Sequence, residues 1–116
     1  MKSFELPLAT RNIRTAAFIN CQSVETIDFP EKVANYGASA FMGCSGLKSV
    51  SVDVSASSDS CVFMKCTSLD QASVKRTLTR RIFMDDTSLK SVSCYALSVV
   101  PEECFRGCTS LTSVHF

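Results

Sequence analysis

AFMGCSGLKSVSV, residues 40–52, is one of five stretches of this sequence that follow a single pattern. The others are AFINCQSVETIDF from Ala17, VFMKCTSLDQASV from Val62, IFMDDTSLKSVSC from Ile82 and CFRGCTSLTSVHF from Cys104. Their anchor phenylalanines, Phe18, Phe41, Phe63, Phe83 and Phe105, are 23, 22, 20 and 22 residues apart. A partial copy precedes them, since residues 4–7 match residues 27–30 at an offset of 23. This near-constant period predicts a solenoid in which each unit forms one coil.

The columns of the alignment are chemically uniform. The third residue after each phenylalanine is a cysteine in four units and an aspartate in one: Cys21, Cys44, Cys66, Asp86 and Cys108. The sixth is an aliphatic residue: Val24, Leu47, Leu69, Leu89 and Leu111. A unit this small cannot bury its own apolar residues, so the units must stack, and each column becomes a ladder along the stack.

Each unit ends in an alternation of apolar and polar residues that is typical of a strand with one buried face. The apolar pairs are Ile27/Phe29, Val50/Val52, Ala72/Val74, Val92/Cys94 and Val114/Phe116. Strands joined by a returning connector must be parallel. We therefore predict an α/β-type repeat solenoid with one curved parallel β-sheet and short helical or irregular convex connectors.

The unit I-x-x-x-A-F-x-x-C-x-x-L-x-x-V-x-V/I-P, seen at Ile13–Pro30 and Tyr36–Val52, resembles the BspA-like leucine-rich repeat of bacterial and protist surface proteins. The resemblance covers almost the whole chain. It departs at Asp86, in the segment Ser55–Ser60, which lacks an expected apolar residue, and in the shortened connector that follows. It implies one leucine-rich-repeat domain over residues 1–116, with about five repeats plus a partial N-terminal one.

Composition restricts the class of protein. The chain has 116 residues, 46% of them hydrophobic, which is enough to bury a core. Twelve basic and eleven acidic residues give a net charge of +1, so we expect no nucleic-acid partner. No apolar stretch is long enough to span a bilayer, and the N-terminus lacks the features of a signal peptide. The resemblance implies a cell-surface or secreted protein, although an intracellular location stays open.

The cysteine count is odd, so at least one of the seven thiols is unpaired within the chain. The ladder cysteines, Cys21, Cys44, Cys66 and Cys108, are predicted to be weak donors packed in the core. Cys94 and Cys104 replace apolar residues and are assigned to the core as well. Cys61 shares a mostly polar column with Ala16, Ser39, Arg81 and Glu103. We therefore predict that Cys61 is an exposed, reactive thiol.

Two chemical alternatives involve the last unit. Cys104, Cys108 and His115 offer three of the four ligands that tetrahedral zinc needs. Cys108 with His115 suggests a thiol nucleophile, but the sequence supplies no orienting third group. It also contains no glycine-rich phosphate loop, paired-carboxylate constellation or Asn-x-Ser/Thr sequon. We therefore predict no enzymatic activity, no metal site and no cofactor.

The outward strand positions form the concave face, through which leucine-rich repeats usually bind partners. This face has no aromatic or arginine anchor, and its charged column alternates in sign, so that Glu25, Lys48, Asp70 and Lys90 are predicted to pair along the stack. The pattern is consistent with weak, hydroxyl-rich recognition or with no recognition. The candidate partner-binding residues on it are Lys48, Asp70, Lys90, Ser51, Ser73 and Ser93.

A basic cluster, KRTLTRR, places Lys75, Arg76, Arg80 and Arg81 within seven residues of a connector. These cations are candidates for binding an acidic protein or a polyanion such as a sulfated sugar. The alternative is an ordinary solvated turn.

Two functions fit the sequence. The first, implied by the resemblance, is a protein-interaction or adhesion module with a protein or glycan ligand. The second is a structural spacer or intracellular scaffold with no partner of its own. Both ends of the chain carry apolar residues, among them Phe4, Leu6 and Phe116, where a solenoid needs polar caps. From this we expect a fragment of a longer array or end-to-end self-association.

Overall fold

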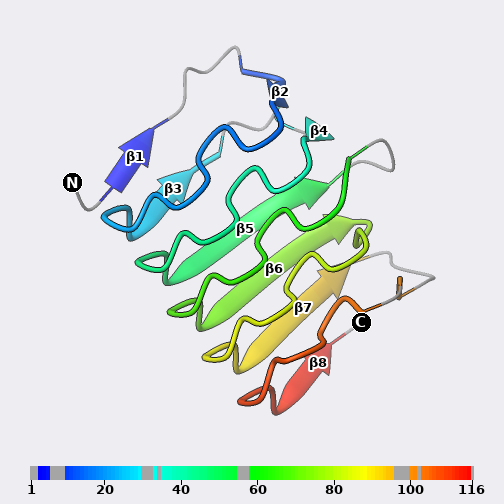
Figure 1. Cartoon of the computed structure of the whole chain (residues 1–116). Helices are drawn as coiled ribbons and strands as arrows, with labels where there is room; N and C mark the ends of the chain where they lie inside the picture. The colour runs from blue at the N-terminus through cyan, green and yellow to red at the C-terminus, as the bar shows by residue number, and fades with distance from the viewer. Residues whose placement is uncertain are drawn as a thin grey trace.

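The computed structural model describes residues 3–5, 10–29, 33, 35–54, 58–95, 100–101 and 103–115. Its strands follow one another along a stack of coils, with the turns of each coil running along one side (Figure 1). They are β1 (Ser3–Glu5), β2 (Asn12–Ile13), β3 (Thr26–Asp28), β4 (Asn35–Tyr36), β5 (Ser49–Val54), β6 (Gln71–Arg76), β7 (Ser91–Tyr95) and β8 (Ser113–His115). Leu6 and Phe116, on which the expectation about the ends partly rests, lie outside the described residues.

Strands β5, β6, β7 and β8 form a continuous four-stranded sheet, and every pair in it is parallel. The register aligns Val50 with Ala72, Ala72 with Val92, and Val92 with Val114, so each apolar column of the alignment becomes a row across the sheet. The predicted alternation is confirmed, because Val50, Val52, Ala72, Val74, Val92 and Cys94 are all buried. The parallel solenoid predicted from the period is therefore the observed fold.

The N-terminal coils are arranged differently. Strand β3 pairs with β1, and β2 pairs with β4, in two separate two-stranded sheets. Just before β3 and β5 begin, their coils are still joined by one hydrogen bond, in which the Lys48 N–H donates to the Glu25 carbonyl at 2.9 Å. No strand pairing between β3 and β5 follows within the described residues. The sheet is therefore interrupted between β3 and β5.

The convex connectors consist of successive turns, and the described residues contain no helix. Two columns adopt left-handed backbone angles, with φ between 55° and 77°: Ala16, Ser39, Cys61, Arg81 and Glu103, and then Asn20, Gly43, Lys65, Asp85 and Gly107. Each coil therefore has two left-handed residues four positions apart, and these end any helical turn that starts between them. Of the two kinds of connector expected, the irregular one is observed.

These turns join the coils through a second ladder of backbone hydrogen bonds. The N–H groups of the first four anchor phenylalanines donate to carbonyls of the following coil, as from Phe41 to Val62 at 2.8 Å and from Phe63 to Ile82 at 2.9 Å. Gly43 illustrates how closely the coils approach, because a Cβ built there would lie 2.1 Å from Oδ1 of Asn20. Coil stacking therefore rests on main-chain bonds on the convex side as well as in the sheet.

Aromatic stacking runs through the core. The rings of Phe18, Phe41, Phe63, Phe83 and Phe105 are nearly parallel, with successive centroids 5.1, 5.3, 6.1 and 6.1 Å apart. The leucine column packs beside them, and Leu47, Leu69 and Leu89 are fully buried. Each phenylalanine contributes a large apolar area to contacts between coils, because no coil has a core of its own.

Three of the four ladder cysteines donate to backbone carbonyls, as predicted. The thiols of Cys44, Cys66 and Cys108 lie 3.1, 3.2 and 3.0 Å from the carbonyl oxygens of the anchor phenylalanine one coil earlier. Cys44 and Cys66 are buried, whereas Cys21 and Cys108 are half-buried. All seven cysteines are free thiols.

Asp86 takes the cysteine position in its own coil and is completely buried. Its Oδ1 accepts the N–H of Cys66 at 2.8 Å, while Oδ2 has no hydrogen-bond partner among the described residues. Burial raises the pKa of this carboxyl group to about 9, the Cys66 N–H opposes that rise, and Asp85 adds to it. The side chain is therefore protonated at neutral pH.

The two atypical connectors differ in how they fill the core. Ser58 occupies the position held by Ile13 and Tyr36 in earlier coils, and its Oγ accepts the N–H of Tyr36 at 3.0 Å. In the next connector Leu78 fills the same column and is buried. Lys75 and Arg76, expected in that connector, instead belong to the end of β6.

Candidate functional site

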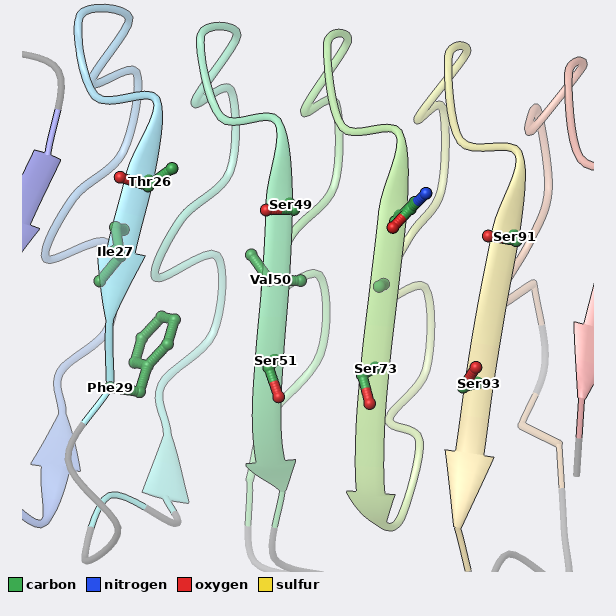
Figure 2. Close-up of a pocket in the computed structure, with 11 residues that line it drawn as sticks. Thr26, Ile27, Phe29, Ser49, Val50, Ser51, Ser73, Ser91 and Ser93 are labelled. Carbon is green, nitrogen blue, oxygen red and sulfur yellow. The ribbon is translucent and has the colours of Figure 1, made fainter.

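The concave face of the sheet carries a broad polar hollow. Hydroxyl side chains of β3, β5, β6 and β7 line a groove of about 680 Å³, together with the amide of Gln71 and the ring of Phe29. Figure 2 shows Ser49 and Ser51, Ser73, and Ser91 and Ser93 in matching positions on neighbouring strands. The groove follows directly from the period, because equivalent outward positions of successive coils lie side by side.

Charges at the edge of this face neutralise one another. Lys48 Nζ lies 2.9 Å from Oε1 of Glu25, and Lys90 Nζ lies 3.9 Å from Oδ1 of Asp70. These two of the predicted pairs are therefore present. Exposed pairs of this kind contribute ~0–1 kcal/mol to stability. Their main effect on the face is that the hydroxyl groove has little net charge along this edge.

A second hollow of about 430 Å³ lies where the sheet is interrupted. We call it the aromatic recess; it is lined by Phe29, Val33, Tyr36, Ser51, Val52, Asp53 and Lys75. Phe29 and Ser51 also line the hydroxyl groove, so the two hollows share a border. Figure 2 shows the Phe29 ring in the space between β3 and β5, at the level of Ser51.

Tyr36 gives the recess an unusual polar group. The residue is 1% exposed, and its hydroxyl has no hydrogen-bond partner in the described part of the chain. Burial, with a smaller contribution from the Asp53 carboxylate, raises the pKa of this phenol above its ordinary value. The phenol is therefore a neutral O–H donor. Leaving such a donor unpaired costs ~1–3 kcal/mol, so it is a candidate contact for a ligand.

The predicted basic cluster is divided among neighbouring coils. Arg76 pairs with Asp53, and Arg81 Nη2 lies 2.7 Å from Oε1 of Glu103. Glu103 also pairs with Arg106, and these two arginines lower the pKa of its carboxyl group. Lys75 and Arg80 are exposed, but Lys75 is at the end of β6 and lines the aromatic recess. The four cations are therefore not gathered in one unpaired patch.

Cys61, predicted as the reactive thiol, is half-buried on the convex side with a left-handed backbone. Burial raises the pKa of the Cys44 thiol to about 11 and that of the Cys66 thiol well above its usual range. Thiolate is the reactive form of cysteine, so these two ladder thiols are poor nucleophiles. The selectivity expected for Cys61 stays a prediction.

The last unit does not assemble its suggested metal or nucleophile site. The Cys104 thiol donates to the Thr79 carbonyl at 3.2 Å, and the Cys108 thiol donates to the Phe83 carbonyl at 3.0 Å. Burial raises the pKa of both thiols to about 11. Across the residues that the structure describes, no three His, Cys, Asp or Glu side chains gather in a way that could hold a metal ion.

Sequence reasoning identified the serine columns but missed the aromatic recess. Phe29 was assigned to an inward column and Tyr36 to the start of a unit. Their contact joins residues of different coils, with ring centroids 5.8 Å apart. One signal was present, since the three following coils have Val52, Val74 and Cys94 where Phe29 stands, and Pro30 follows Phe29. Proline cannot donate to a sheet ladder.

The described residues include no helix long and apolar enough to cross a membrane. No curated protein matches the sequence significantly. Solved structures do match: a leucine-rich repeat protein from Bacteroides ovatus superposes with a TM-score of 0.85 at 30% identity, over 99% of this chain and 30% of that one.

Two further crystal structures are similar in fold. A leucine-rich repeat protein from T. pallidum has a TM-score of 0.82 at 23% identity, over 97% of this chain and 57% of that one. A leucine-rich cell surface protein from Faecalibacterium prausnitzii has a TM-score of 0.57 at 19% identity, over 99% of this chain and 32% of that one. The present chain thus spans less than two thirds of each.

Comparison with protein families gives the same result from sequence. Residues 1–112 match the BspA type leucine-rich repeat region in six copies. The match covers nearly the whole chain, and the anchor-phenylalanine, cysteine and leucine ladders account for it physically. The chain therefore belongs to the BspA-type leucine-rich repeat family.

Proposed function

We propose that this chain is the binding segment of a cell-surface or secreted adhesion protein and that it holds its partner on the concave face. Leucine-rich repeats of this family are protein-interaction modules in general. The observation that carries the proposal is the 680 Å³ groove, in which outward hydroxyls of four successive coils are presented together. The surface location is supported by the similar F. prausnitzii protein, which is a leucine-rich cell surface protein.

The face favours many weak contacts over a few strong ones. Its hydroxyls each offer one donor and two acceptor sites. The two outward columns along the groove, Thr26, Ser49, Gln71 and Ser91, and Ser51, Ser73 and Ser93, contain no aromatic or arginine anchor. Binding through such a face gains strength when several copies of the ligand or of the protein are displayed together. Display on a cell surface supplies that condition.

The test is binding of the purified chain to a glycan array and to immobilised extracellular-matrix proteins. We expect saturable binding that Ser73→Trp abolishes, because Ser73 lies on β6 within the groove. Ser68→Trp is the matched control, since Ser68 is exposed in the turn before β6 and does not line the groove. Unchanged circular dichroism in both variants separates loss of binding from loss of fold.

The basic cluster is tested in the same assay. Lys75→Gln combined with Arg80→Gln removes two exposed cations while leaving the Arg76–Asp53 and Arg81–Glu103 pairs intact. Weaker binding with a reduced salt dependence would make these residues part of the partner site. If the chain binds neither the glycans of the array nor the matrix proteins, the alternative of a structural spacer replaces the adhesion proposal.

A further inference from the structure

The aromatic recess points to a more specific ligand than the adhesion proposal names. Its floor is formed by Phe29 and Tyr36, which pack edge to face against each other, and its polar groups are Ser51, Asp53 and Lys75. Val33 and Val52 complete the wall and are buried. A hollow that combines an apolar floor with a few convergent polar groups is the usual form of a small-ligand site.

The unpaired phenol supplies the first constraint on the ligand. Tyr36 O–H is a buried donor with no acceptor among the described residues, and the Asp53 carboxylate in the same recess is an acceptor. One hydroxyl group placed between them can accept the hydrogen of the phenol and donate its own to the carboxylate. An alcohol satisfies both groups at once, whereas a carboxylate or phosphate would be repelled by Asp53.

Charge supplies the second constraint. Asp53 is already paired with Arg76, and the edge of the adjoining groove carries the Glu25–Lys48 and Asp70–Lys90 pairs. Beyond these pairs the described lining of the recess holds one further charged side chain, the exposed Lys75, whose ammonium can donate to a sugar hydroxyl. The net charge of the surface is therefore small, and a strongly acidic or strongly basic ligand gains little from it. The groove beside the recess offers hydroxyls of Thr26, Ser49, Ser73 and others, together with the amide of Gln71.

The aromatic floor supplies the third constraint. The faces of aromatic rings are electron-rich and attract weakly positive C–H groups. A saturated ring with C–H bonds on one face and hydroxyls around its edge fits this recess. Its C–H face would contact Phe29, and its hydroxyls would contact Tyr36 and Asp53.

On these grounds we propose that the aromatic recess and the adjoining hydroxyl groove bind a neutral saccharide chain, with one sugar ring seated over Phe29 between Tyr36 and Asp53. The inference rests on the proposed function, because it names the ligand class for the same concave face. It assigns a positioning role to Ser51, which lines both hollows and lies at their border. Further sugar units extend across β5, β6 and β7.

The test uses neutral gluco-, manno- and galacto-configured oligosaccharides and, beside them, sulfated ones, measured by calorimetry and saturation-transfer NMR on the whole chain. We expect at least one neutral series to bind and Tyr36→Phe to weaken it about three- to tenfold, as for one lost hydrogen bond. The melting temperature of Tyr36→Phe should stay level or rise, because the variant removes an unpaired buried hydroxyl. A purely structural tyrosine would not give this split between binding and stability.

Two further variants locate the site. Phe29→Leu keeps an apolar side chain and removes the aromatic face, so binding should weaken while the fold is retained. Ser51→Trp should block the border between the hollows, and Ser113→Trp is its control, since Ser113 is on the same sheet in β8 and lines neither hollow. Saccharide binding that none of the three site variants reduces would overturn the inference.

The remaining outcomes are distinguishable. The chain could bind matrix proteins, with this binding blocked by Ser73→Trp, and yet bind no saccharide. That result would overturn this inference and leave the adhesion proposal standing. Binding of sulfated sugars alone would also overturn it, since the ligand would then be recognised by charge. If neither proteins nor saccharides bind, both proposals fail.

Discussion

The two halves of this stack differ in how their sheets are joined. In the C-terminal half, β5 to β8 pair without interruption, and small or aliphatic side chains occupy the inward columns. In the N-terminal half, β3 pairs only with β1 among the described strands, and Phe29 stands where the next coils have Val52 and Val74. The same repeat therefore builds a continuous sheet in one half and leaves a recess, lined by Phe29, between β3 and β5 in the other.

The halves also differ in what they offer a ligand. The continuous half presents a regular row of hydroxyls, whereas the break adds an aromatic floor and a phenol with no hydrogen-bond partner among the described residues. A uniform ladder satisfies its own backbone groups, so only its outward side chains are left for binding. The departure from regularity supplies the groups with unused hydrogen-bonding capacity.

The largest expected effect concerns the aromatic ladder. Phe63 stacks against a ring on each side and is fully buried, whereas Phe18, in the first complete coil, is only partly buried. Phe63→Ala should lower the free energy of unfolding by ~3–5 kcal/mol, and Phe18→Ala by clearly less. Urea unfolding of both variants measures the difference, with Cys44→Ala as a milder control. An equal or greater loss from Phe18→Ala would remove the distinction between the halves.

The second effect comes from Asp86, the exception within the continuous half. Three thiols of its column donate to the carbonyl of the preceding anchor phenylalanine. Asp86 departs from this pattern, because its Oδ1 accepts the Cys66 N–H and its Oδ2 has no hydrogen-bond partner among the described residues. Asp85 is the ionisable group that adds to the rise in its pKa, and Asp86 in turn raises the pKa values of the Cys66 and Cys108 thiols.

The sign of the pH dependence follows from the folded pKa of about 9. The unfolded aspartate loses its proton near pH ~3.9, and the folded one keeps it to much higher pH. Stability from this group is therefore fully present below pH ~4 and falls as pH rises towards 9, by at most ~1.4 kcal/mol per pH unit. Urea midpoints at pH 5 and 8 for the natural chain and for Asp86→Cys measure it.

The comparison with Asp86→Cys cancels the surface ion pairs that both proteins share. The natural chain should lose more stability than the variant between the two pH values. Parallel pH profiles would show that Asp86 is ionised in the folded state and that the thiol column tolerates a buried charge.

The smallest effect concerns access to thiols. A brief iodoacetamide pulse under native conditions, read by mass spectrometry, should label Cys61 before Cys44 and Cys66, because Cys61 is only half-buried on the convex side. Between the two buried thiols, Cys44 should react before Cys66, since its coil borders the break in the sheet and opens more readily. Labelling of Cys66 ahead of Cys61 would contradict the assignment of the inward and outward columns.

The sequence by itself determined the stack. The period, the phenylalanine, cysteine and leucine columns and the alternation after them were enough to predict parallel coils with the observed inward faces. The reason is that every unit repeats the same local pattern, so five imperfect copies reinforce a single interpretation. The serine columns of the concave face followed from the same period, because outward positions alternate with inward ones.

Only the tertiary structure decided how neighbouring coils differ. The break beside Phe29, the unpaired Tyr36 hydroxyl and the pairing of Arg76 with Asp53 each depend on contacts between units about one period apart. The protonation of Asp86 likewise depends on burial between coils. Such contacts are set by the exact length of each connector and the volume of single side chains, which a repeating pattern averages out.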